Sequence, residues 1–289
     1  FAVPARSRLT VFGLLAMMLL WAPVGGLVEL GNWTAVSALA LPLSLLLAYR
    51  GRWDAAALVL GVSVAIKPLL VPVILLFIMA RQWRAAAWAL TVPAALCAGA
   101  VCLMRDPSAF LTRTLPFLLK GGDAVMKPYD CSLPAVLPRL GVPMAAAAAA
   151  GAAAAAAGVA FAWLRWRRSD PGPLRIAETA AMLMLATYLV SRPSFSHYLV
   201  VVVPLLLAST SLEGSITRIS WFWVALIPQV PGFAFPYLDD LGRRAFKDMG
   251  TLLILALVVA AKCARRTWAG NAVAPAVRKG APRRGHAGN

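Results

Sequence analysis

Long apolar runs bounded by charged residues constrain this chain more than any other feature. A helix needs roughly 20 such residues to cross about 30 Å of hydrocarbon. The apolar residues follow one another without alternating, which excludes spanning β-strands. Of the 289 residues, 61% are hydrophobic and 13% charged, against about 45–50% and about 25% in soluble domains. We therefore predict an all-α, polytopic integral membrane helical bundle with roughly eight spans, at residues 9–28, 33–49, 85–104, 144–163, 176–190, 198–211, 219–235 and 249–264.

The strongly basic charge balance indicates an orientation in the plasma membrane. The chain has 28 Lys and Arg against 11 Asp and Glu, a formal net charge of +17. Nucleic-acid binding is the weaker interpretation, because no soluble domain is predicted to carry such an interface. The cations gather in short loops and near the C-terminus, where the positive-inside rule places them in the cytoplasm. We expect a multi-pass transmembrane domain over 1–267 and a disordered, basic, cytoplasmic tail over 268–289.

The segment 55–80 departs from this simple pattern, because Lys67-Pro68 lies in its middle. A single span would put the basic clusters Arg50-Gly51-Arg52 and Arg81-Gln82-Trp83-Arg84 on opposite sides, against the positive-inside rule. We predict instead a short-helix hairpin that turns at Lys67-Pro68 and lines a polar pocket open to the outside. The alternative is one Pro-kinked helix in which Lys67 extends toward the interface.

The longest connection, 105–143, is predicted to lie on the outer side. Loops of this length in a compact chain usually carry function. Apolar residues between 110 and 119 favour a short amphipathic helix on the bilayer surface, where it would meet a lipid tail.

Polar residues at the outer ends of the spans are the candidate functional residues. Lys67, at membrane depth, favours an anionic partner such as a phosphate, and a structural ion pair is the alternative. Asn32 opens a span and either hydrogen-bonds a sugar hydroxyl or caps the helix. His197 and Tyr198, at the mouth of another span, either bind a phosphate or a sugar hydroxyl or anchor the interface.

Motifs of soluble enzymes and of metal sites are absent from the sequence. Its four cysteines form no C-x-x-C pair and have no His at ligand spacing. Walker A, dinucleotide-binding and G-x-S-x-G patterns are missing too, so we expect neither a metal nor a cofactor. Asp239 and Asp240 are followed by Arg243 and Arg244, which is more typical of a solvated, salt-bridged loop than of acid or base catalysis.

Several stretches resemble known membrane enzymes. The run Gly61–Pro72, which contains Lys67-Pro68, and Arg81-Gln82-Trp83-Arg84 resemble the signature of glycosyltransferase family 87, the polyprenol-phosphate-sugar-dependent enzymes of the GT-C class. The stretches Asp106–Pro116, with its Thr-Arg-Thr-Leu-Pro run, and Gly141-Val142-Pro143 resemble the α(1→3)-arabinofuranosyltransferases of actinobacterial arabinan synthesis. The resemblance covers most of residues 9–260.

The resemblance implies transfer of arabinofuranose from decaprenyl-phosphate-arabinofuranose to an arabinan on the outer face of the plasma membrane. It implies that Lys67 and Arg113 bind the donor phosphate, with His197 and Tyr198 near the donor. The family's catalytic Asp follows an initial span that would precede Phe1. We therefore expect the N-terminal third of the family fold to be missing, and we assign no catalytic residue.

Two departures from the family pattern leave the donor sugar open. Tyr129-Asp130-Cys131-Ser132 replaces an Asn-rich element, and His197-Tyr198 replaces a pair of Tyr. A polyprenol-phosphate-mannose-dependent mannosyltransferase is the alternative within the class. A lipid-linked sugar transporter or flippase would also use a Lys at the midplane, but the single Lys-Pro break and the lack of an internal repeat argue against it.

Overall fold

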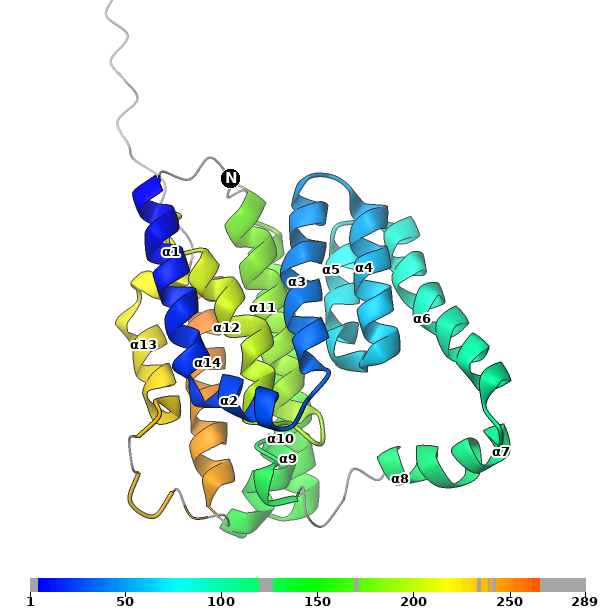
Figure 1. Cartoon of the computed structure of the whole chain (residues 1–289). Helices are drawn as coiled ribbons and strands as arrows, with labels where there is room; N and C mark the ends of the chain where they lie inside the picture. The colour runs from blue at the N-terminus through cyan, green and yellow to red at the C-terminus, as the bar shows by residue number, and fades with distance from the viewer. Residues whose placement is uncertain are drawn as a thin grey trace, which may run out of the picture.

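The chain is helical throughout the part that the structure, a computed structural model, describes. That part comprises residues 5–119, 127–168, 172–232, 235–238, 240 and 243–265, and it contains no β-strand (Figure 1). The predicted all-α class is confirmed for these residues. A helix satisfies its own backbone hydrogen bonds, as an apolar surrounding requires. The predicted tail, 268–289, lies outside the described residues.

Within the described residues, three helices are long and apolar enough to cross a membrane: α6 (Trp83–Leu103), α10 (Met144–Trp166) and α11 (Gly172–Val190). A fourth candidate is the bent pair Arg8–Leu20 and Ala22–Glu29, whose halves meet at 59°. It comprises most of α1 (Ala5–Met17), a short 3-10 turn, and α2 (Ala22–Glu29). The length and composition of these helices support the prediction that the chain is a membrane protein.

The predicted count of eight spans is not confirmed, because the other predicted spans form shorter or charged helices. Helix α3 (Thr34–Tyr49) has 16 residues and α12 (Leu199–Ala208) has 10, so they reach only about 24 and about 15 Å. The predicted span 219–235 is wrong as a continuous helix: α13 covers Ser220–Leu226, and a 3-10 turn containing Pro228 follows it. Helix α14 (Arg244–Ala264) begins at Arg244 and contains three further charged residues, Lys247, Asp248 and Lys262.

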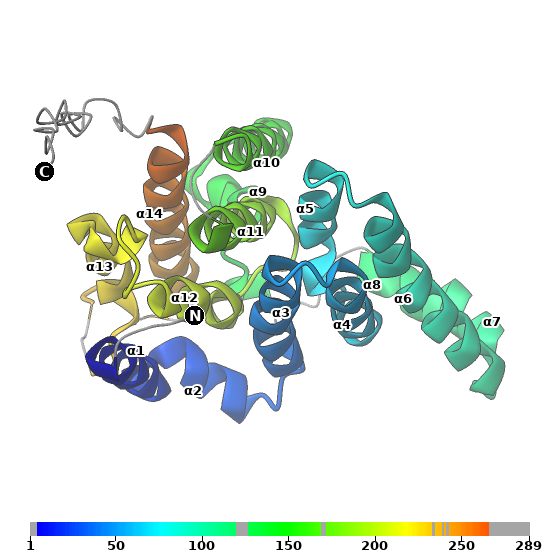
Figure 2. The ribbon, with the colours of Figure 1, turned by 90° about the horizontal axis from the view of Figure 1, so that it is seen from above.

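Helix α11 lies at the centre of the bundle, in contact with α3, α10, α12 and α14 (Figure 2). Most of its side chains from Ile176 to Leu189 are buried. Helix α10 approaches it so closely that a Cβ on Gly158 would lie 2.3 Å from the Cβ of Ala186. The Ala-rich sequence of α10 permits this close approach, because small residues let helix backbones meet.

The same helix pair contains a buried ion pair. Arg165, near the end of α10, is 1% exposed, and its Nε lies 2.6 Å from Oε2 of Glu178 in α11. Because both groups are removed from solvent, each charge depends on the other for compensation.

The chain reverses at Lys67-Pro68. Helix α4 (Trp53–Ile66) ends at Lys67, whose φ of −149° and ψ of 120° are extended, as a residue before proline favours. A 3-10 turn (Pro68–Val73) and α5 (Ile74–Met79) lead back. As a result, Asp54 Oδ2 at the start of α4 lies 3.4 Å from Arg84 Nε at the start of α6. The hairpin that the sequence predicts is formed, and the single kinked helix is wrong.

The connections sort into two ends of the bundle (Figure 1). One end, here called the basic end, holds the basic loops 50–52, 81–82 and 167–168. There Arg168 Nη1 donates to the backbone oxygen of Lys262, at the end of α14, at 3.3 Å. The opposite end holds Lys67 and the connections α2–α3, α6–α7 and α11–α12. Basic loops far apart in the sequence thus lie together.

The loop 105–143 begins with a helical segment that runs from the end of α6 back toward the bundle (Figure 1). It comprises α7 (Pro107–Ala109), one π-helical turn (Phe110–Thr114) and α8 (Leu115–Leu119). Ser108 Oγ and the Ala109 N–H donate to Asp106 Oδ1 at 2.6 and 3.0 Å, and they hold the pKa of that carboxyl below its usual range. The helix predicted within 110–119 is therefore formed, and a second short helix, α9 (Leu133–Val136), packs against α10.

Candidate functional site

The ammonium group of Lys67 lies among neutral partners supplied by two other segments. Its Nζ donates to Asn32 Oδ1 at 2.7 Å and to Thr34 Oγ1 at 2.6 Å. The same Nζ lies 4.6 Å from the centroid of the Tyr198 ring, in cation–π geometry. Three parts of the chain thus meet here: the start of α3, the α4–α5 turn and the start of α12.

Asn32 connects this ammonium to His197. Its Oδ1 accepts from the Thr34 N–H at 3.0 Å and from the Thr34 hydroxyl at 2.9 Å, so it caps the first turn of α3. Its Nδ2 lies 3.2 Å from His197 Nε2, and because an amide nitrogen only donates, Nε2 is the accepting, unprotonated nitrogen of the imidazole. Of the two roles that the sequence left open for Asn32, the cap is formed, and a hydrogen bond to a sugar hydroxyl stays a prediction.

A cluster of aromatic side chains packs around His197 and Tyr198. The rings of Phe195 and His197 stack with centroids 5.3 Å apart, and Tyr198 packs edge-on against His197 at 4.9 Å. Tyr188 of α11 contacts the Tyr198 ring at 5.6 Å. His197 and Tyr198 are 5% and 7% exposed, so packing fixes their orientation.

Asp130 fixes the loop that carries His197. Its Oδ1 accepts from the backbone N–H of Ser132 at 3.1 Å and of Ser194 at 3.0 Å, and its Oδ2 lies 3.6 Å from Arg192 Nε. The Cys131 N–H also donates to the Ser194 oxygen at 2.8 Å. Segments 127–136 and 191–198 are therefore joined through a buried carboxylate, a role that the sequence did not indicate.

Lys67 has no carboxylate within ion-pair distance among the described residues. It is half-buried, so its charge is partly removed from water and is met by neutral oxygens and a ring face. A cation in this state favours an anionic ligand. The structural ion pair considered from the sequence is absent within the described residues.

The structure does not bring the other candidates into this group. Arg113 is exposed and lies in the π-helical turn, whose main contacts are with α7 and α8. Asp240 accepts the backbone N–H groups of Arg243 and Arg244 at its carbonyl, at 2.8 and 2.9 Å, and Asp239 lies outside the described residues. Thr34 is the member of the site that the sequence analysis missed. Its signal was the polar cluster Leu30–Thr34 in an apolar sequence.

The model of glycosyltransferase family 87 matches residues 2–192. This range contains Asn32, Lys67 and Asp130 and ends just before the segment that carries His197 and Tyr198. Neither the curated proteins nor the solved structures include a match to this chain.

Proposed function

The chain belongs to glycosyltransferase family 87, and from this membership and the Lys67 site we propose that it transfers a sugar from a polyprenyl-phosphate donor. The proposed acceptor is a cell-envelope glycan or glycolipid on the outer face of the plasma membrane. Arabinofuranose is the proposed sugar, and mannose is the alternative. In this proposal the basic end faces the cytoplasm and the Lys67 end faces outward, following the positive-inside rule.

One observation carries the proposal: the Lys67 ammonium contacts neutral oxygens and no carboxylate among the described residues. In such a transfer the acceptor hydroxyl attacks the anomeric carbon and loses its proton to a base, the bond from that carbon to the phosphate oxygen breaks, and polyprenyl phosphate leaves with the electron pair. Negative charge therefore grows on the phosphate, and a fixed, half-buried cation beside it stabilises that charge. Asn32 and Thr34 hold Lys67 at 2.7 and 2.6 Å without neutralising it.

The proposal assigns the remaining residues by position. Asn32, His197 and Tyr198 bind the donor beside Lys67. Arg113 stays a predicted second ligand of the phosphate, and this role requires the segment 107–119 to approach Lys67 when the donor binds. No residue is assigned as the catalytic base.

An apolar cavity supplies a place for the polyprenyl chain. It measures about 690 Å³ and lies between the first helix, α12 and α13. Val203 and Leu207 of α12 line it, and Tyr198 directly precedes that helix. At about 1.5 Å per residue, Val203 lies only about 8 Å along the axis from Tyr198. A donor with its phosphate on Lys67 thus has an apolar cavity within reach of its chain.

The experiment is a transfer assay with radiolabelled polyprenyl-phosphate-arabinofuranose and, in parallel, polyprenyl-phosphate-mannose. Membranes with the native chain should transfer one sugar, and Lys67→Ala should lose that activity while still inserting. Lys127→Ala is the matched control, because Lys127 is exposed at the same end. Full activity in Lys67→Ala would remove this residue from the mechanism. Movement of the intact donor across proteoliposomes without transfer would favour the flippase instead.

A further inference from the structure

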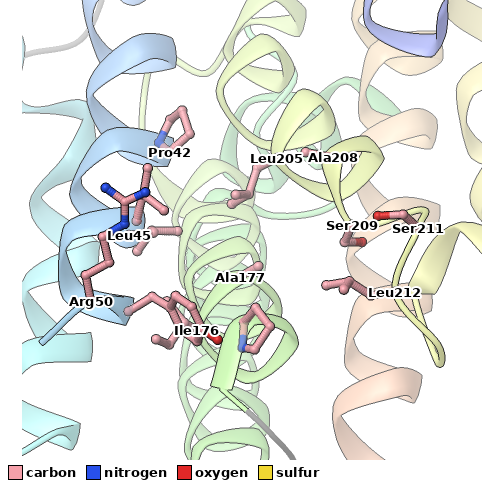
Figure 3. Close-up of a pocket in the computed structure, with 13 residues that line it drawn as sticks. Pro42, Leu45, Arg50, Ile176, Ala177, Leu205, Ala208, Ser209, Ser211 and Leu212 are labelled. Carbon is pink, nitrogen blue, oxygen red and sulfur yellow. The ribbon is translucent and has the colours of Figure 1, made fainter. Parts of the chain in front are cut away.

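A second cavity lies at the basic end of the bundle, whereas Lys67 lies at the opposite end. It opens between α3, α11 and α12 (Figure 3) and measures about 340 Å³. Small-molecule sites have volumes of about 300–1,000 Å³. The cavity is therefore large enough for a ligand of limited size or for part of a longer one.

The walls of this cavity are apolar, and its rim is open. Leu45 of α3 and Ile176 of α11 are 4% and 5% exposed and form its inner surface. Pro42, Tyr49 and Ala208 are exposed at its edge. Because the rim residues Pro42 and Ala208 are exposed and apolar, the cavity meets its surroundings at an apolar edge, which suits contact with lipid in a membrane.

Arg50 is the one charged residue among those that line the cavity. It follows the last residue of α3 and is exposed, and among the described residues no carboxylate lies within ion-pair distance of it. Glu213, which follows Leu212 in the sequence, does not line the cavity. Ser211 lines the wall of the cavity that lies opposite Arg50 (Figure 3).

We propose that this groove binds an anionic glycerophospholipid, with the lipid phosphate on Arg50 and one acyl chain between α3, α11 and α12. Arg50 and apolar side chains line the same cavity, which matches a molecule whose phosphate is joined through glycerol to hydrocarbon chains. Cationic pockets between membrane helices recognise anionic headgroups in this way, and each buried methylene adds to the binding. A soluble anion would leave the apolar walls unused.

The test measures lipid adducts on the purified full chain by native mass spectrometry. Phosphatidylglycerol and phosphatidylcholine with identical acyl chains are added in equal amounts. The native chain should prefer phosphatidylglycerol. Arg50→Gln should lower that preference by about fivefold, the effect of one basic side chain on anionic lipid. Arg52→Gln is the matched control, because Arg52 is exposed in the same loop and does not line the cavity.

A second pair of variants tests the groove itself. Ala208→Trp at the rim and Leu205→Trp on the wall should each remove the retained adducts of both lipids, with helicity by circular dichroism unchanged. Glycerol phosphate, a headgroup without chains, should not compete. The proposal is overturned if Arg50→Gln keeps the native preference, if Arg52→Gln loses as much, if neither Trp variant reduces the adducts, or if glycerol phosphate displaces the lipid.

Discussion

The ammonium of Lys67 stands near two neutral oxygens and a ring, and this predicts opposite effects of its removal on stability and on activity. A half-buried charge without a counterion is costly to fold. Lys67→Met should therefore keep or raise the thermal midpoint of unfolding in detergent. Sugar transfer should fall by about 10²–10³-fold, as for loss of one group that stabilises a transition-state charge. A parallel loss of stability and activity would indicate a structural role instead.

Asn32 offers a sharper test of charge at the same place. Asn32→Asp keeps an acceptor for the Thr34 N–H but sets a carboxylate at the position of an oxygen now 2.7 Å from Lys67 Nζ. An ion pair then compensates the ammonium, so an anionic donor should bind at least about tenfold more weakly. We expect a raised KM for the donor. Asn32→Ser, which also caps helices well but adds no charge, should raise KM far less. An equal rise in KM for both variants would show that the added charge is not the cause.

Most members of the site could be predicted singly from the sequence, but not that they lie together. Lys67, Asn32 and the pair His197-Tyr198 each stand out as polar residues in apolar sequence. Their convergence depends on how α3, the hairpin and α12 pack, which no local pattern encodes. Arg113 was predicted for the same site from a resemblance in sequence, and it lies in a different part of the structure. Asp130 was missed because its hydrogen bonds join segments more than 60 residues apart, Asp130 to Ser194 being 64.

At the scale of elements, the α10–α11 contact depends on the absence of a side chain at Gly158. Gly158→Ala would place a Cβ 2.3 Å from that of Ala186, and we expect a loss of about 1–3 kcal/mol from overpacking, measured by unfolding in mixed micelles. Ala186→Gly in the same chain should restore most of it. Gly99→Ala in α6 is the control: a Cβ there meets nothing within 4 Å, so it should be neutral or stabilising. A loss at Gly99 equal to that at Gly158 would contradict the packing argument.

The sequence predicted correctly that the elements are helices, but it predicted more membrane spans than the described residues form. Continuous apolar runs predict helices wherever they occur, and α6, α10 and α11 follow from them. The run 219–235 looked like one more span because its composition is apolar, yet Pro228 and Pro231 interrupt the backbone hydrogen bonds. Similarly, Arg165 looks like a loop cation in sequence and is buried beside Glu178.

For the whole molecule, the hairpin and the clustering of basic loops make one joint prediction about orientation. Single cysteines at Arg52 and Gln82, in a background without the four native cysteines, should both react with a membrane-impermeant thiol reagent from the cytoplasmic side only. Leu30→Cys, in the α2–α3 turn at the Lys67 end and 59% exposed, should react from outside only. Gly51 is unsuitable, because its φ of 76° strains any other residue. Labelling of 52 and 82 from opposite sides would contradict the hairpin, whereas reversal of all three would keep the fold and put the proposed sugar transfer on the cytoplasmic face.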